Sequence, residues 1–251
     1  GDNAAIEASF CEFAEKINDK SNLFIAEGLP LEGKTVAVNQ HADCKAFNVK
    51  IENGIYVFDA QIGDNVLLGL EFPLPGNHNL MNATMALAMA YKYGITEVQI
   101  AAALKSFKGI QRRFSYQIQS DDLVYIDDYA HHPTEINAVY QAVRELFPED
   151  EILAIFQPHL FSRTKDFADD FASSLSKFDK VLLLDIYPAR ELPMPGITSQ
   201  WLLDKISNNS KKLVSKENLI TEIKLANCKV VITIGAGDIG EMVSPIKEAL
   251  S

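Results

Sequence analysis

The sequence predicts an α/β protein in two parts, a mixed sheet with helices followed by a mostly parallel, doubly wound sheet. Its 251 residues, 47% of them hydrophobic, are enough for one or two compact domains. Turn signals divide residues 46–72 into three β-type segments, which indicates an antiparallel meander. From residue 114 onward, apolar β-type runs alternate with helical patterns, which is typical of a parallel sheet. We expect the seam between the parts near residues 109–113.

The first part is expected to open with a helix and two short strands. Ile6, Phe10 and Phe13 recur at helical spacing within residues 4–17. Strands follow at 23–26 and 35–38, and then at 46–51, 55–62 and 66–72, with Asn53-Gly54 and Gly63-Asp64 as the hairpin turns. Two helices complete this part: 79–93, ended by Gly94, and 96–107, capped by Thr96.

The second part alternates five strands with five helices. The strands are expected at 114–118, 124–126, 152–156, 181–184 and 230–234. The helices are expected near 133–147, 162–177, 198–207, 216–225 and 239–250. This alternation predicts a Rossmann-like domain, in which ligands bind beyond the carboxyl ends of the strands.

Composition excludes several classes of partner. The formal net charge of −11 disfavours duplex nucleic acid and anionic membranes, both of which are bound through clustered Lys and Arg. No apolar run approaches the roughly 20 residues that span a bilayer, and the first 20 residues are acidic where a signal peptide would be basic. Cys11, Cys44 and Cys228 are isolated and fit neither a disulfide framework nor a zinc ribbon. We therefore expect a soluble, cytoplasmic protein with reduced thiols.

Residues 28–35, GLPLEGKT, fit the pattern of a phosphate-binding loop. A working loop is followed by a helix whose N-terminal amides face the phosphates, yet VAV at 36–38 continues as a strand. Glu32 would also face the phosphates, and Pro30 removes one amide donor. We interpret this segment as a plain connection between strands.

The segment PGNHNLMNA at 75–83 runs from a turn into a helix. Asn77 or Asn79 could cap that helix. His78 and Asn82 are one helical turn apart, so both side chains can reach one edge of a ligand, as an adenine requires.

The densest polar cluster is DDYAHHPTE at 127–135, where a buried strand ends and a helix starts at Pro133. Metal binding by Asp127, Asp128, His131 and His132 is an alternative, but neighbouring side chains in an extended turn diverge. Hydrogen bonding to sugar hydroxyls or to a cationic substrate fits the cluster better.

Three further segments carry polar residues near strand ends. FQPHLFSRT at 156–164 places Arg163 in a first helical turn, where its charge opposes the helix dipole and so suggests an anionic partner. Arg112-Arg113, at the seam, could hold a phosphate or make interdomain salt bridges. GAGDIG at 235–240 is read as a tight turn with Asp238 as the N-cap.

Five segments, spread over residues 76–240, together resemble the Mur ligases. In chain order they are GNHNLMNA, GIQRRF, DDYAHHPTE, FQPHLFSRT and GAGDIG. The resemblance implies that residues 1–111 are the later part of a central ATP-binding domain, here truncated, and that 112–251 are the complete C-terminal domain. Family members begin with a sugar-nucleotide domain and a phosphate loop of GTHGKTTT type, followed by magnesium ligands. None of these occurs here, so we expect the chain by itself to be inactive.

The resemblance also implies roles for individual residues. His78 and Asn82 would contact adenine, while Arg113 and Asp128 would contact the ribose and phosphates of the nucleotide. Tyr129, His131 and Arg163 would line the side where the amino acid meets the acyl phosphate, with His131 and Arg163 as the catalytic pair. Some family members have arginine where Leu160 stands, so no charge role is carried to that position.

The implied reaction is ligation of L-alanine to the carboxylate of UDP-N-acetylmuramate through an acyl phosphate, with ATP and Mg as cofactors and with the magnesium ligands in the missing part. A sister enzyme that recycles a tripeptide shares a DDxAHHPT-like block, but QPHLFSRT resembles the alanine-adding members. The alternatives are that tripeptide ligase, a non-catalytic nucleotide-binding module, and a metallohydrolase built on the aspartates and histidines of residues 127–132.

Overall fold

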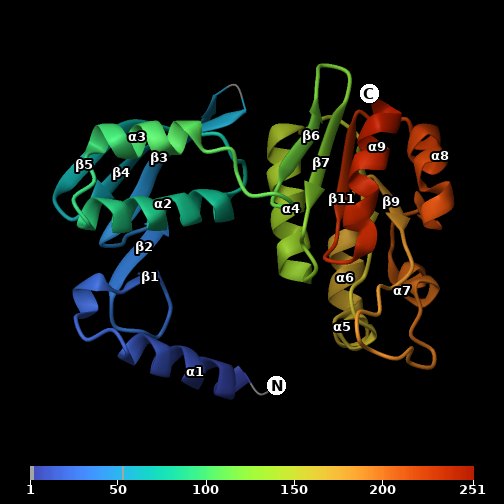
Figure 1. Cartoon of the computed structure of the whole chain (residues 1–251), viewed down its shortest axis with the longest axis horizontal. Coiled ribbons are helices and arrows are strands. Elements are labelled where there is room, and N and C mark those ends of the chain that lie inside the picture. Colours follow the sequence, from blue (N-terminus) through green and yellow to red (C-terminus); the bar gives the residue numbers. More distant parts are fainter. Residues whose placement is uncertain (1–2, 53) are drawn as a thin grey trace. The chain divides into compact units, whose positions relative to one another are not determined.

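The computed structural model describes residues 3–52 and 54–251, which form two compact units, Gly1–Lys108 and Gly109–Ser251. We call them unit 1 and unit 2 and describe each by itself (Figure 1). None of the helices in the described part of the chain is long and apolar enough to cross a membrane.

Unit 1 is a five-stranded mixed sheet with helices. Its elements are α1 (Asn3–Glu15), η1 (Lys20–Asn22), β1 (Phe24–Ala26), β2 (Lys34–Val38), β3 (Cys44–Glu52), β4 (Ile55–Ile62), β5 (Asn65–Phe72), α2 (Asn77–Lys92) and α3 (Glu97–Ser106). The strands lie in the order β1-β2-β3-β4-β5, with β1, β2 and β3 parallel and β3, β4 and β5 antiparallel. The expected meander is confirmed. Asn53 of its first turn lies outside the described residues, and Gly54 has the left-handed φ of +78°.

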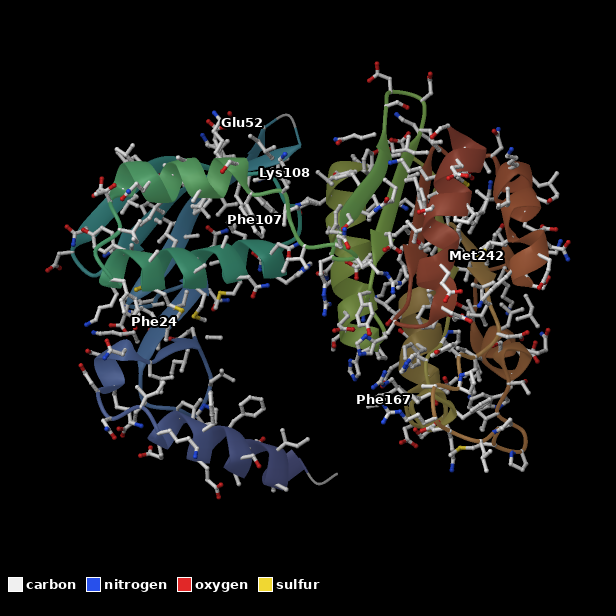
Figure 2. The ribbon with its side chains drawn as sticks, viewed as in Figure 1. Phe24, Glu52, Phe107, Lys108, Phe167 and Met242 are labelled. Atoms are coloured by element: carbon white, nitrogen blue, oxygen red, sulfur yellow. The ribbon has the colours of Figure 1, made fainter. Side chains whose placement is uncertain are left out.

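The core of unit 1 lies between the sheet and helices α2 and α3, which pack on it (Figures 1 and 2). Phe58 and Leu70 of the sheet and Leu80 and Leu87 of α2 are almost completely buried there. Thr96 caps α3 as expected, and Gln99 completes a capping box.

Unit 2 contains a six-stranded sheet. Its strands are β6 (Ser115–Gln119), β7 (Val124–Asp128), β8 (Ile152–Phe156), β9 (Lys180–Leu183), β10 (Lys211–Leu213) and β11 (Val230–Ile234). Its helices are α4 (Pro133–Leu146), α5 (Phe161–Asp166), α6 (Ala168–Leu175), α7 (Ser199–Lys205), α8 (Lys216–Ala226), η2 (Asp238–Met242) and α9 (Val243–Leu250). The strand order is β10-β9-β8-β11-β7-β6, and every described pair is parallel except β6 with β7. The mostly parallel, Rossmann-like sheet is therefore confirmed.

Each face of this sheet carries its own core. On one face, Ile136 and Val139 of α4 pack with Phe171 of α6. On the other face, where α8 and α9 lie (Figure 1), Leu219 and Ile246 belong to one buried cluster. Burial on both faces explains why β7, β8 and β11 are buried along their whole length.

Three details of unit 2 differ from the sequence predictions. The helix expected at 162–177 is two helices, because the backbone leaves helical geometry at Phe167, labelled in Figure 2, whose ring packs on His132 at 4.7 Å between centroids. The helix expected at 239–250 begins as the 3-10 turn η2. Strand β10 was not expected, since KKL carries no β-type alternation.

Candidate functional site

The candidate site lies in unit 2, at the carboxyl ends of three adjacent parallel strands. Strand β11 lies between β7 and β8, and Ile234 is level with both Asp128 and Phe156. The polar segments that follow these strands therefore leave the sheet at the same edge. This brings together three of the segments that the sequence singled out.

Aromatic and cationic side chains form a connected row at this edge. The guanidinium carbons of Arg112 and Arg113 lie 5.1 and 5.5 Å from the ring centroid of Tyr129. The ring of Tyr129 meets His131 edge-on at 5.4 Å, and His131 lies 6.2 Å from His159. Tyr129 thus contacts both Arg113 and His131 at this edge.

His131 is oriented by backbone and carboxylate groups. Its Nδ1 lies 3.0 Å from the carbonyl oxygen of Tyr129, which can only accept, so this bond places a hydrogen on Nδ1 and leaves Nε2 for the site. Its backbone N–H donates to Glu135 at 2.8 Å, and Glu135 also lies 3.8 Å from Arg113. His132, by contrast, is the N-cap of α4, where its side chain accepts from the N–H of Thr134.

Arg163 lies beside His159, with its Nη1 3.4 Å from Nδ1 of that histidine. The His159 ring also stacks on Tyr187 at 5.6 Å. Burial, together with the charges of Arg163 and His131, lowers the pKa of His159. The result is a pair in which a neutral imidazole sits next to a fixed cation.

The two adjacent aspartates are buried and point to different partners. Asp127 accepts from Thr233 at 2.7 Å and from Arg112 at 3.2 Å, and burial raises its pKa against these bonds. Asp128 is 4% exposed, and its two oxygens accept from the backbone N–H groups of Phe114 and Ala130, both at 2.7 Å. Burial raises the pKa of Asp128 to about 6, against those two bonds. Its carboxylate therefore fixes the backbone here, and a nucleotide contact stays a prediction.

The other cation at the seam, Arg112, bonds within unit 2. Besides Asp127, its guanidinium donates to the carbonyl oxygen of Gly235 at 2.6 Å. Both partners belong to the same unit as Arg112, so these two bonds are not interdomain salt bridges.

The segment at 235–240 is shaped by close packing. A Cβ on Gly237 would lie 2.7 Å from Cβ of Tyr187, and one on Gly240 would lie 2.7 Å from a guanidinium nitrogen of Arg112. The expectation that Asp238 is the N-cap is wrong, because Gly237 holds that position. The carboxylate of Asp238 instead accepts from the amide of Gln157 at 2.7 Å and forms an ion pair with Lys216. The glycines thus let the loop approach side chains of the site.

The remaining candidate residues lie in unit 1. His78 and Asn82 are exposed one turn apart on α2. Neither Asn77 nor Asn79 caps this helix: the N-cap position is Gly76 without a side-chain bond, and the amide of Asn79 donates back to Pro75. A contact of His78 and Asn82 with a nucleotide stays a prediction.

The segment GLPLEGKT leads into strand β2 at Lys34, as expected, and not into a helix. The N–H and hydroxyl of Thr35 both donate to Asp43, at 2.9 and 3.1 Å. The interpretation as a connection between strands is confirmed.

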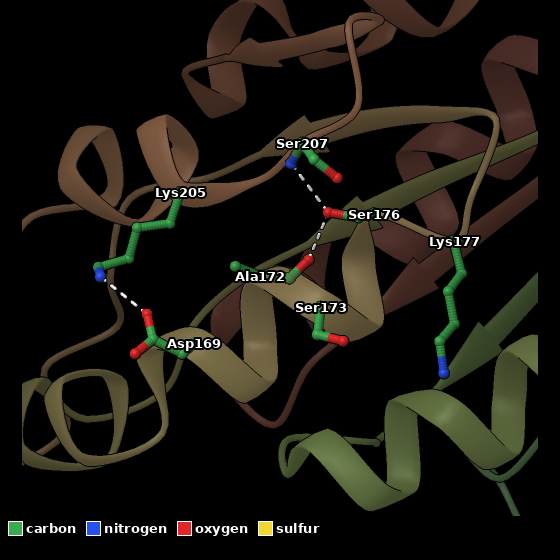
Figure 3. A pocket seen from close by; sticks show the side chains of 7 residues that line it. All are labelled: Asp169, Ala172, Ser173, Ser176, Lys177, Lys205 and Ser207. Atoms are coloured by element: carbon green, nitrogen blue, oxygen red, sulfur yellow. Dashed lines mark hydrogen bonds and ion pairs between the residues drawn. The ribbon is translucent and has the colours of Figure 1, made fainter.

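Two other surface features of unit 2 lie on different residues from this site. A pocket of about 530 Å³ is lined by residues of α6 and of the turn after it, by Lys205 of α7 and by Ser207, with an ion pair between Lys205 and Asp169 (Figure 3). A second, of about 460 Å³, includes Leu123, Cys228 and Leu250. Across residues 3–52 and 54–251, no group of three or more His, Cys, Asp or Glu side chains could hold a metal ion.

Sequence reasoning missed Tyr187 and Glu191, which lie in the loop after β9. Glu191 accepts from the N–H of Ser162 at 2.9 Å. His159 stood inside the quoted FQPHLFSRT segment without a role. The loop after β9 also follows the carboxyl end of a parallel strand, and β9 lies next to β8 in the sheet. That position is the signal that could have singled out this loop.

An open parallel sheet with this polar edge defines a ligand-binding α/β domain, and the comparisons specify its class. Residues 112–237 match the family described as Mur ligase, glutamate ligase domain. The chain belongs to the Mur ligase family.

The curated relatives are more specific. UDP-N-acetylmuramate–L-alanine ligase of Flavobacterium johnsoniae is 64% identical over the whole chain, and that of Porphyromonas gingivalis is 42% identical over 96% of it. The chain spans 56% and 55% of these relatives, so it corresponds to about half of their length.

Solved structures share the fold. The UDP-N-acetylmuramate-alanine ligase of Thermotoga maritima matches with a TM-score of 0.74 at 24% identity, over 89% of this chain and 49% of that one. A murein peptide ligase of Psychrobacter arcticus matches with a TM-score of 0.57 at 24% identity, over 89% and 48%.

Proposed function

We propose that this chain is part of an ATP-dependent ligase that joins L-alanine to the carboxylate of UDP-N-acetylmuramate in peptidoglycan precursor synthesis. The observation that carries the proposal is the gathering of Tyr129, His131, His159 and Arg163 at one edge of the sheet, inside the region that matches the family. High identity to relatives with that name supports this choice of amino acid and sugar nucleotide.

The chemistry is activation of a carboxylate followed by attack of an amine. ATP supplies the phosphoryl group that activates the muramoyl carboxylate, the neutral amine of L-alanine attacks the acyl phosphate, and phosphate leaves. Such steps depend on positioning and on cations near the developing charge. Arg163 offers a fixed cation next to His159, and His131, on the other side of His159, offers Nε2 as an acceptor. We assign Arg163 and His131 to the amino-acid side, with Tyr129 as a contact.

Nucleotide binding is assigned to residues from both units. His78 and Asn82 are exposed on one face of α2, which suits an adenine edge, and the half-exposed Arg113 suits a phosphate or ribose contact. Asp128 fits this group less directly, because it already accepts two backbone N–H groups. The described residues do not fit a magnesium site, so we place the magnesium ligands outside this sequence and derive no step from them.

The nearest alternative is the tripeptide-recycling ligase that acts on the same sugar nucleotide. The murein peptide ligase of known structure shares the fold with this chain, which does not separate the two activities. A non-catalytic nucleotide-binding module is the alternative outside enzymes. We place the complete protein in the cytoplasm, where its nucleotide substrates are made.

The test is release of phosphate by the full-length protein with ATP and UDP-N-acetylmuramate, comparing L-alanine with the tripeptide. We expect release with L-alanine, and none from the 251-residue chain alone. Arg163→Ala should lower kcat/KM for L-alanine by a factor that corresponds to about 2–4 kcal/mol of lost transition-state stabilisation, the range for a desolvated charge or transition-state donor.

The matched control is Lys165→Ala, which removes an exposed cation from the same helix and should change little. Faster release with the tripeptide than with L-alanine would favour the recycling ligase. No amino-acid-dependent release at all would favour the non-catalytic module.

A further inference from the structure

We propose that Glu191, in the loop between β9 and α7, is a positioning residue for the amino-acid side of the site, because it holds the first turn of α5 and with it the His159–Arg163 pair. This inference rests on the proposed function. It assigns Glu191 no contact with substrate. Its action runs through Ser162.

The first observation is that α5 is capped from outside. The N-cap residue Leu160 makes no side-chain capping bond. In its place, one carboxylate oxygen of Glu191 accepts from the N–H of Ser162 at 2.9 Å, and the other accepts from the Ser162 hydroxyl. These bonds hold the pKa of Glu191 below its usual range, so the group is charged at neutral pH. A carboxylate 29 residues away in the chain thus does the work of an N-cap.

The second observation is strain next to this cap. Leu160 has φ of +72°, a left-handed conformation that a leucine rarely adopts. Such conformations persist when the surrounding structure fixes them, and they cluster at functional sites. Here the same loop supplies the restraint: Leu160 donates to the carbonyl of Tyr187 at 2.9 Å, and Tyr187 donates to the carbonyl of Pro158 at 2.8 Å.

The third observation is electrostatic. The carboxylate of Glu191 carries a negative charge that interacts with the cation of Arg163. It also opposes the effect of burial, Arg163 and His131 on the pKa of His159. Glu191 therefore acts on the His159–Arg163 pair in two ways, by holding the first turn of α5 and by its negative charge.

The experiment uses the full-length protein with Glu191→Ala, Glu191→Gln, Ser162→Ala and the double variant Ser162→Ala/Glu191→Ala. The control is Glu248→Ala, which removes an exposed carboxylate from α9. Each protein is assayed for the KM of L-alanine, the KM of ATP and kcat. Hydrogen exchange over residues 157–166 and an NMR titration of His159 give two readouts that need no turnover.

We expect Glu191→Ala to raise the KM for L-alanine about 10- to 100-fold, since a small misplacement near a reacting centre can cost about 10²-fold. The KM for ATP should stay within about twofold. Glu191→Gln should have a smaller effect, because the amide oxygen still accepts from Ser162. The double variant should be no worse than Glu191→Ala, because both changes break the same contact. Exchange over residues 157–166 should accelerate, and the pKa of His159 should fall further.

An unchanged KM for L-alanine in folded Glu191→Ala protein would overturn the inference, as would equal increases in the KM for both substrates. If the wild-type protein shows no alanine-dependent turnover, the proposed function fails while exchange and titration still decide the restraint. Unchanged exchange and an unchanged His159 pKa would then overturn it as well.

Discussion

Unit 1 and unit 2 contain similar sequence patterns that are buried to very different degrees. Helix α4 of unit 2 buries Ile136 completely and Val139 to 2% exposure. Helix α1 of unit 1 has the same kind of apolar spacing, yet Phe10 and Phe13 are 63% and 67% exposed. A periodic pattern therefore predicts the helix, while burial depends on what packs against its apolar face.

The polar motifs of the two units differ in the same way. In unit 2, the FQPHLFSRT segment is tied to a second loop through Tyr187 and Glu191. In unit 1, the GLPLEGKT segment lies at the surface, and Lys34 has only a loose ion pair with Asp43 at 3.9 Å. The difference teaches that a motif indicates a site only where other elements enclose it.

The largest expected effect in this comparison comes from a pair of large-to-small substitutions in the 251-residue chain, one at a buried and one at an exposed position. Ile136→Ala should destabilise unit 2 by about 2–5 kcal/mol, because it leaves a cavity among fully buried side chains. Phe10→Ala should change stability by no more than about 0.5 kcal/mol, because that ring is mostly exposed.

Urea unfolding measures both changes. Trp201, the single tryptophan of the chain, packs against the core of unit 2 and reports its unfolding by fluorescence, while circular dichroism follows the whole chain. Equal losses from the two substitutions would contradict the contrast between α1 and α4.

How much the sequence could predict follows the same division. Strands β8 and β11 were placed with their observed ends, because a strand buried on both faces is a continuous apolar run. The edge strand β10 was missed, because its polar residues follow no pattern. The common edge of the segments that carry Tyr129, His131 and Arg163 could be anticipated, since parallel strands end at one edge. The restraint from Glu191 could not, because it depends on how a distant loop packs.

A second test compares the charges of two aspartates. Burial raises the pKa of Asp128 in unit 2 to about 6, whereas the N–H of Thr35 lowers the pKa of Asp43 in unit 1. Between pH 4 and pH 6, native Asp128 binds more protons than the unfolded chain, so its contribution to stability falls as pH rises. Asp43 has the opposite sign: its contribution is present above its unfolded pKa and is lost as pH falls.

The measurement is the difference in unfolding free energy between wild type and Asp128→Asn, followed by Trp201 fluorescence. Between pH 4.5 and pH 6.5, the stability of the wild type relative to Asp128→Asn should fall by about 2 kcal/mol, because the pKa of Asp128 is raised by about two units in the folded protein. A difference that does not depend on pH would show that Asp128 keeps an ordinary pKa despite its burial.

The smallest expected effect is at Lys34, and there a small value is the informative result. In a working phosphate loop this lysine would contact the transferred phosphates, and Lys34→Ala would lower kcat of the full-length protein by roughly 10²–10³. In the structure, Lys34 begins strand β2, and its side chain and that of Asp43 are about half exposed. Ion pairs of this kind contribute little.

We therefore expect Lys34→Ala to leave turnover unchanged and to move stability by no more than about 0.5 kcal/mol. Lys50→Ala, on the neighbouring strand β3, is the matched control. A hundredfold loss of turnover in folded Lys34→Ala protein, with the Lys50 variant active, would make the exposed loop of unit 1 a working site and end the contrast between the two units.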